Sequence, residues 1–175
     1  MIFHRVTEKP SSGESLEDWA RIMRYEYLSN LLNVSSLALT AHHAQDQTET
    51  IIQRILRGSG PYGLTGIPRL RRLGNGWLYR PFLEVKKDEL TSFSSRKKLQ
   101  WLEDPMNQDL RFTRNRIRKA IIPELEKIST GFEKNLRKLS GIQFDLVSHI
   151  DALTDSKIIK KMEDKKKVPL KLLKE

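Results

Sequence analysis

Two carboxylates lie one helical turn apart near the middle of the chain, at Asp46 and Glu49. At 100° per residue, Gln53 and Arg57 fall within about 60° of Asp46, which predicts a helix with one polar face. Two carboxylates on one helix can hold Mg²⁺ bound to a nucleotide, or orient an amine nucleophile. Acidic residues also suit the first turn of any helix, so spacing alone favours a solvated turn. The segments on either side of this helix shift the balance towards a site.

Both flanks of this helix carry residue types found in binding sites. His42 and His43 precede it and could ligate a metal, but adjacent side chains diverge, and packing or hydrogen bonding is the better interpretation. After the helix comes a short run formed by Arg57, Gly58, Ser59 and Gly60. Its glycines would let the backbone approach a phosphate closely, although a helix C-cap explains Gly58 equally well.

A second group of charged residues follows about sixty residues later. Arg114 and Arg118 lie one turn apart near the start of a predicted helix, where they could bind phosphate or a nucleic-acid backbone. Cations at a helix start oppose the helix dipole, a small cost that points to an anionic partner. Pairing with the nearby Glu103, Asp104 or Asp109 is about as good an explanation.

Hydrophobic periodicity and turn residues predict the elements that must position these groups. Helices are expected at 15–32, with Ser15 as the cap, and at 44–57, 86–99, 114–128 and from 132 onward, and strands at 34–41 and 77–83. Pro123 should kink or restart its helix, Gly141 is a weak point in the last one, and 58–76 is expected to be a functional loop. The apolar side of the 44–57 helix should dock on the sheet, so Asp46 would lie just beyond a strand end, where open α/β sheets bind ligands.

Composition bounds the class of protein. The 175 residues include no cysteine, which excludes disulfides, thiolate nucleophiles and cysteine-based metal sites, and no apolar run is long enough for a membrane span. We therefore expect a cytoplasmic protein. The formal charge is +10, of which residues 1–110 carry +2 and residues 111–175 carry +8. This asymmetry predicts two domains with that boundary, the second a basic helical extension that favours nucleic acid.

A series of short motifs runs in order over roughly residues 12–125. The segments are Gly13-Glu14-Ser15-Leu16-Glu17, Ala20-Arg21 with Arg24-Tyr25, His42-His43 with Asp46-Gln47 and Glu49-Thr50, Arg57-Gly58-Ser59-Gly60 with Gly63-Leu64, Arg80-Pro81-Phe82-Leu83, Glu103-Asp104-Pro105 with Asn107, Arg114-Asn115 with Arg118, and Ile122-Pro123. Together they closely resemble the tRNA(Ile)-lysidine synthetases of the PP-loop ATP pyrophosphatase superfamily.

The resemblance implies a reaction and its participants. These enzymes activate C2 of the wobble cytidine of a CAU-anticodon isoleucine tRNA by adenylation with ATP, and the lysine ε-amine then displaces AMP. By resemblance, the catalytic residues would be Asp46, Glu49 and Arg114, the ATP-binding residues His42, Arg57, Gly58, Ser59 and Gly60, and the tRNA-binding residues Arg114 and Arg118. Mg²⁺ would arrive with the nucleotide, with no protein-bound metal. The oligomeric state stays open, a homodimer included.

One family signature is missing from the printed sequence. The Ser-Gly-Gly-x-Asp-Ser loop that grips ATP phosphates in the superfamily does not occur, and Ser12-Gly13-Glu14-Ser15 does not replace it. We therefore expect an α/β, partial Rossmann-like (adenine nucleotide alpha hydrolase-like) PP-loop domain that is N-terminally truncated and lacks its first strands, followed by basic helices. A catalytically inactive, tRNA-binding remnant is the alternative. A related PP-loop tRNA thiolase fits less well, because those enzymes commonly use cysteines.

Overall fold

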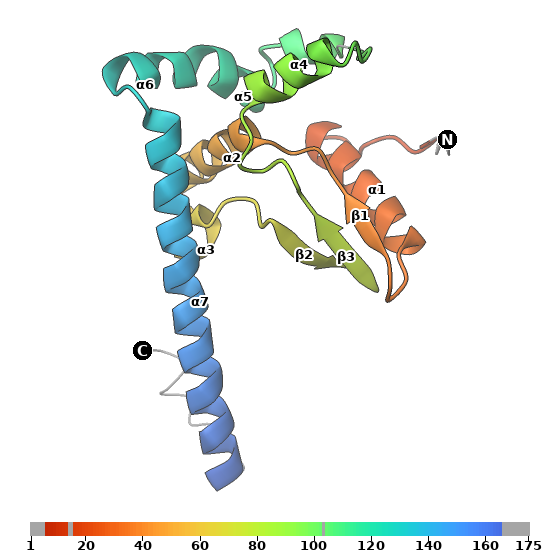
Figure 1. Ribbon diagram of the computed structural model, residues 1–175. Coiled ribbons are helices and arrows are strands. Elements are labelled where there is room, and N and C mark those ends of the chain that lie inside the picture. The colour runs from red at the N-terminus through yellow and green to blue at the C-terminus, as the bar shows by residue number, and fades with distance from the viewer. Residues whose placement is uncertain (1–5, 14–15, 103, 166–175) are drawn as a thin grey trace.

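The computed structural model describes residues 6–13, 16–102 and 104–165, with side chains for all of these except residues 17 and 155–165. In chain order the elements are α1 (Leu16–Leu31), β1 (Leu37–Leu39), α2 (Ala44–Leu56), α3 (Pro61–Leu64), β2 (Leu70–Leu73), β3 (Gly76–Tyr79), α4 (Lys87–Arg96), the 3₁₀ turn η1 (Pro105–Gln108), α5 (Thr113–Arg116), the π-helical turn η2 (Ile117–Ile121), α6 (Ile122–Ile128) and α7 (Phe132–Lys165). Figure 1 shows α2 between the sheet and α7, which extends well beyond the other elements. The expected cap Ser15 and residues 166–175 lie outside the described residues.

A small mixed sheet forms one side of the molecule. Its strand order is β1-β3-β2, with β1 parallel to β3 and β2 antiparallel to it. The α/β class expected from the sequence is therefore confirmed at this level. The first strand is shorter than expected, because Asn33 forms a turn in which its side-chain oxygen accepts from the Ser35 backbone N–H (3.1 Å) and the Ser36 hydroxyl (2.7 Å).

The two faces of this sheet have different surroundings. Leu78 of β3 pairs with Ala38 of β1 and is fully buried on the face towards α1. Leu37 and Leu39, on either side of Ala38, point to the other face and are 55% and 63% exposed. Paired residues share a face, so Trp77 and Tyr79 accompany those two leucines. Within the described residues, that second face is an open apolar surface.

The expected loop 58–76 contains regular structure, and this expectation was wrong. It holds the short helix α3 and the strand β2. The strand was missed because its sequence, Leu-Arg-Arg-Leu, shows no alternation of apolar and polar types. Both arginines find aromatic partners instead: the Arg72 guanidinium lies 3.9 Å from the Trp77 ring centroid, and that of Arg71 lies 4.8 Å from the Tyr25 ring centroid.

The apolar side of α2 packs on helices rather than on the sheet, contrary to expectation. Ile51 and Ile52 are buried in a cluster with three apolar side chains from the C-terminal helices, namely Ile117, Ile122 and Leu136. Thr48 adds a polar link, since its hydroxyl accepts from the Arg137 guanidinium of α7 at 3.2 Å. The C-terminal helices therefore fix the orientation of α2 about its axis.

Of the two outcomes expected at Pro123, the structure shows a restart: Pro123 lies in the first turn of α6, directly after the π-helical turn η2. The Ile122 backbone N–H donates to the Ile117 carbonyl, five residues back, in the turn η2 that precedes Pro123. Because proline has no N–H, a local change in hydrogen bonding before it is expected. Gly141, by contrast, does not interrupt α7.

Candidate functional site

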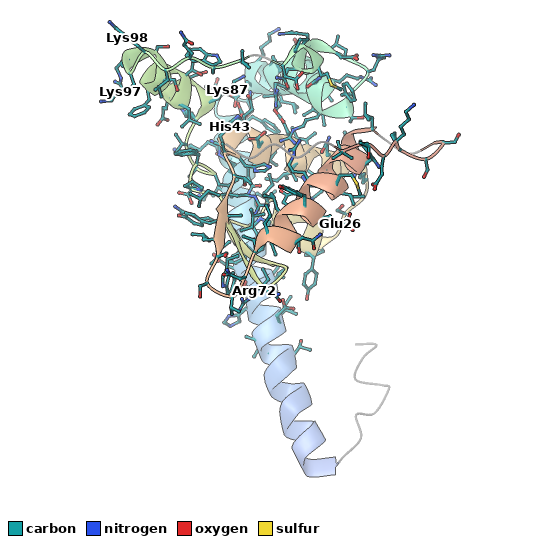
Figure 2. The ribbon with its side chains drawn as sticks, turned by 90° about the vertical axis from the view of Figure 1, so that its right-hand side faces the viewer. Glu26, His43, Arg72, Lys87, Lys97 and Lys98 are labelled. Atoms are coloured by element: carbon teal, nitrogen blue, oxygen red, sulfur yellow. The ribbon has the colours of Figure 1, made fainter. Side chains whose placement is uncertain are left out.

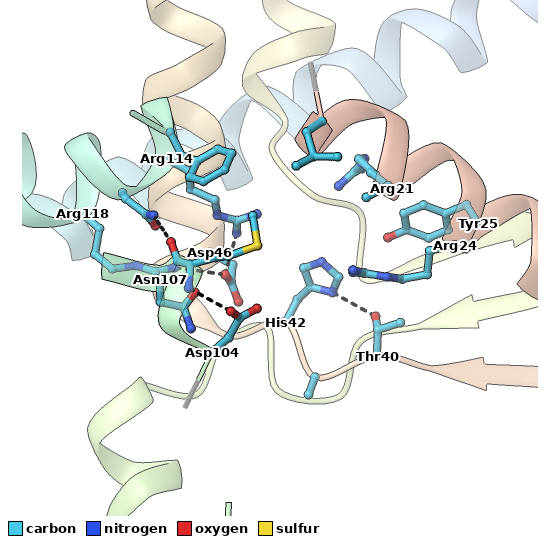
Figure 3. Close-up of a pocket in the computed structure, with 16 residues that line it drawn as sticks. Arg21, Arg24, Tyr25, Thr40, His42, Asp46, Asp104, Asn107, Arg114 and Arg118 are labelled. Carbon is cyan, nitrogen blue, oxygen red and sulfur yellow. Dashed lines mark hydrogen bonds and ion pairs between the residues drawn. The ribbon is translucent and has the colours of Figure 1, made fainter. Parts of the chain in front are cut away.

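A pocket of about 700 Å³ opens beyond the carboxyl end of β1. One side, which we call the α1 wall, consists of Arg21, Arg24 and Tyr25. Facing it are Asp46 and the side chains of η1 and α5, with His42 between the two sides (Figure 3). The pocket therefore lies at the strand end where the sequence placed a ligand site.

The predicted charged residues meet in a single carboxylate cluster, formed by Asp46, Glu49, Arg114 and Arg118. The Arg114 guanidinium donates through Nη2 to Asp46 Oδ1 and through Nε to Glu49 Oε2, each at 2.5 Å. Arg118 donates through Nε to Glu49 Oε1 at 2.6 Å. Among the described contacts these arginines do not pair with Asp104 or Asp109, and Glu103, the third partner that the sequence offered, lies outside the described residues.

The two carboxylates of this cluster have different exposure. Glu49 is fully buried, and both of its oxygens accept from arginines. Asp46 keeps 14% of its side chain exposed and lines the pocket, while its Oδ2 accepts from the His43 backbone N–H at 2.8 Å. Asp46 is thus accessible from the pocket, whereas Glu49 holds the two arginines that also line it.

His42 is neutral at physiological pH in this environment. Burial lowers the pKa of His42 to about 4, against an opposing effect from Asp46 and with a smaller contribution from the Arg80 charge. Its Nδ1 lies 3.0 Å from the Thr40 hydroxyl, which fixes the ring at the pocket. Burial also lowers the pKa of His43. A neutral imidazole offers the pocket a hydrogen-bonding group without adding charge.

Asn115 anchors the loop that forms the wall opposite α1, although no role was predicted for this residue from the sequence. It is buried, and its amide nitrogen donates to the carbonyls of Met106 and Asp109, each at 2.8 Å. Asp104 stabilises the same loop by accepting from the Met106 backbone N–H at 2.9 Å. The only sequence signal for Asn115 was its place beside Arg114 in a motif.

Arg80 supports the α1 wall from below and was also missed. This residue is 1% exposed, and its guanidinium donates to the Pro68 carbonyl at 2.6 Å and to the Tyr25 hydroxyl at 3.3 Å. Burial raises the pKa of Tyr25, but the Arg80 hydrogen bond and the Arg80, Arg21 and Arg71 charges outweigh it and lower the pKa overall. A charged residue ending an apolar strand was the available signal.

The run Arg57 to Gly60 lies away from the pocket. Arg57 caps the C-terminal end of α2, eleven residues after Asp46, which is about 16 Å along a helix axis. Gly58 has a positive φ of 69° and its N–H donates to the Ile55 carbonyl at 2.9 Å, as expected for a helix C-cap. Nucleotide binding by this run stays a prediction that the geometry does not support.

No group of three or more His, Asp or Glu side chains able to hold a metal ion occurs among the described residues. In the same part of the chain, no helix has both the length and the apolar character needed to cross a membrane.

The fold and the strand-end pocket define an α/β domain with a candidate site at a strand end, and comparison with known proteins identifies its family. A family model described as a PP-loop domain matches residues 1–125. The chain therefore belongs to the PP-loop domain family.

Within that family the chain is similar to enzymes named tRNA(Ile)-lysidine synthase. It is 40% identical to that of Pseudomonas syringae pv. tomato over 141 residues, which are 81% of this chain and 32% of the relative. It is 45% identical to that of Pseudomonas aeruginosa over 113 residues, 65% of this chain and 26% of the relative, and 36% identical to that of Vibrio parahaemolyticus over 152 residues, 87% and 35%. The chain thus spans about a third of the length of these curated relatives.

Proposed function

We propose that this chain contributes to ATP-dependent ligation of lysine to the wobble cytidine of CAU-anticodon tRNA(Ile), the reaction of a tRNA(Ile)-lysidine synthetase. The cytidine O2 attacks the α-phosphorus of ATP and pyrophosphate leaves. The lysine ε-amine then attacks C2, and O2 departs with AMP. One observation carries the proposal: in a PP-loop chain similar to these enzymes, the carboxylate cluster lies at the strand-end pocket.

Asp46 is assigned to the lysine amine. The attacking ε-amine must be neutral, although its ordinary pKa is about 10.4. A carboxylate that accepts hydrogen bonds from the amine orients it and can take up the proton that the nitrogen releases as it attacks C2. Asp46 is the partly exposed carboxylate of the cluster, and it lines the pocket.

Arg114 and Arg118 are assigned to phosphate, from the adenylated cytidine or from the tRNA backbone. A guanidinium binds phosphate oxygens as readily as carboxylates. When phosphate enters, Arg114 can exchange Asp46 Oδ1 for a phosphate oxygen while Glu49 keeps its Nε in place. That exchange leaves Asp46 available to the amine, and Glu49 acts as a positioning residue.

ATP enters as its Mg²⁺ complex, so the metal is part of the substrate. Asp46 is the member of the carboxylate cluster that lines the pocket as a carboxylate, so it could also approach the nucleotide-bound ion. Neutral His42 could donate a hydrogen bond to the nucleotide or accept one from it. The cytoplasm, where tRNA, lysine and ATP are present, is the proposed location.

The second candidate function is tRNA binding without catalysis. It is favoured by the +8 charge of residues 111–175 and by the lack of a Ser-Gly-Gly-x-Asp-Ser segment in the printed sequence. Basic helices alone can bind RNA through phosphate contacts.

One assay separates the two functions. The chain is incubated with Mg-ATP, labelled lysine and CAU-anticodon tRNA(Ile), and both lysine incorporation and AMP release are measured. Incorporation that falls at least a hundredfold in Asp46→Asn, but not in the exposed control Glu84→Gln, supports the ligase. Salt-sensitive tRNA binding with neither product would instead establish the non-catalytic function for this chain.

A further inference from the structure

The α1 wall has an excess of positive charge that the carboxylate cluster does not neutralise. Arg114 and Arg118 are engaged by Asp46 and Glu49 on the far side of the pocket. Arg21 and Arg24 line the same pocket, and among the described side chains neither forms an ion pair. Figure 3 shows the two arginines on the opposite side of the pocket from Asp46.

Stacking pre-organises this wall. The Arg21 guanidinium lies 5.1 Å from the Tyr25 ring centroid, and that of Arg71 lies 4.8 Å from the same centroid. Tyr25 is held in turn by the buried Arg80, which is itself bound to the Pro68 carbonyl. A guanidinium held on an aromatic ring loses less conformational freedom when it binds an anion.

Arg24 completes the wall one helical turn after Arg21. Residues three apart on a helix share a face, so both guanidinium groups can approach one anion from the same side. His42, which lies between the walls, is neutral and so neither competes with an anion nor repels it. Solvated arginines on a helix surface would not require this shared placement beside a stacked tyrosine in a pocket.

We propose that Arg21 and Arg24 form an anion subsite that holds a carboxylate or phosphate group of a small substrate opposite Asp46. Each arginine presents paired N–H donors that match either group. Lysine with its α-carboxylate and ATP with its phosphates each supply the chemistry, and in this respect the inference rests on the proposed function. An amino acid bound here would extend from the α1 wall towards Asp46, amine foremost.

The test measures binding, by calorimetry on the full chain, with paired probes. Lysine is compared with cadaverine, which lacks the carboxylate, and ATP with adenosine, which lacks the phosphates. The variants are Arg21→Gln and Arg24→Gln, and Arg96→Gln, exposed at the end of α4, is the control of equal charge. Circular dichroism checks that each variant is folded.

We expect each α1 variant to weaken binding of lysine or of ATP at least tenfold, with cadaverine and adenosine unaffected and the control unchanged. A loss confined to the lysine pair identifies a carboxylate, and a loss confined to the ATP pair identifies a phosphate. The subsite is refuted by equal losses for cadaverine or adenosine, the probes that lack the anionic group. It is also refuted by unchanged binding of lysine and ATP in both variants, or by no measurable affinity of the unaltered chain for lysine and ATP.

This result is separable from the fate of the proposed function. Anion binding that depends on Arg21 and Arg24 in a chain that forms no lysidine would leave the subsite standing and remove the ligase. Lysidine formation that persists with unchanged lysine and ATP affinities in both variants would do the reverse.

Discussion

Asp46 and Glu49 lie one turn apart on α2, yet their surroundings give them different dependence on the fold. Glu49 is fully buried and accepts from two arginines, so removing its charge leaves both guanidinium groups with a single shared carboxylate. We expect Glu49→Gln to lower the free energy of unfolding by about 3 kcal/mol, the range for breaking a buried pair. Asp46→Asn should cost less, because Asp46 is partly exposed.

Urea unfolding of both variants measures this difference. Glu84→Gln is the control, since its ion pair with Arg69 is exposed and should contribute less than about 1 kcal/mol. A Glu49→Gln variant as stable as this control would contradict a structural role for the buried carboxylate.

His42 gives the protein a pH dependence of defined sign. Its pKa is about 4 in the folded chain and near 6.5 when unfolded, so the unfolded state takes up the proton first as pH falls. The stability that neutral His42 contributes is therefore present above pH 6.5 and lost between pH 6.5 and about 4. The free energy of unfolding changes across that window, and we expect His42→Gln to reduce this change by about 1–2 kcal/mol, a figure that allows for the partial exposure of His42.

The measurement is chemical unfolding at a series of pH values. His149→Gln, exposed on α7, is the control and should keep the pH dependence of the unaltered chain. An unchanged slope in His42→Gln would show that folding does not lower the pKa of His42.

At the scale of elements, Asn115 joins the η1 loop to α5 and so to the carboxylate cluster. Asn115→Ala removes the donor to two carbonyls, which should cost about 1–3 kcal/mol and release the loop. We expect amide hydrogen exchange to quicken at residues 105–112. Asn135→Ala, exposed on α7, should leave that exchange unchanged, and protection of 105–112 in both variants would show that other contacts hold the loop.

The elements also show what a sequence of this kind can reveal. Helical periodicity predicted α1, α2 and α4 because each carries its pattern within a few turns. The residues that pack on the apolar side of α2 could not be predicted from the sequence around that helix, because Ile117 and Leu136 lie some 65 to 85 residues further along the chain. For the same reason Glu49 looked like a pocket residue: the arginines that bury it come from α5 and η2. The structure brings Asp46, Arg114 and Arg118 together, a contact that neither group of residues indicated by itself, and their roles stay proposals.

For the whole molecule, the uneven charge predicts where RNA binds. Residues 111–175 carry +8, and Arg116 and Lys119 are exposed there, beside the carboxylate cluster. If each contacts a phosphate, the double variant Arg116→Gln/Lys119→Gln should reduce the slope of log K against log salt for tRNA binding by about 1.4–1.8, because each lost contact removes about 0.7–0.9.

Charge placement, rather than net charge, is tested by a matched variant. Lys97→Gln/Lys98→Gln removes two charges at the free end of α4, which Figure 2 shows at the upper end of the view, well above Arg72 of the β2–β3 hairpin. This variant should keep the original slope, because α4 belongs to the nearly neutral residues 1–110. Equal reductions in the two double variants would mean that tRNA responds to the total charge of the chain, and the basic helices would then not be its docking surface.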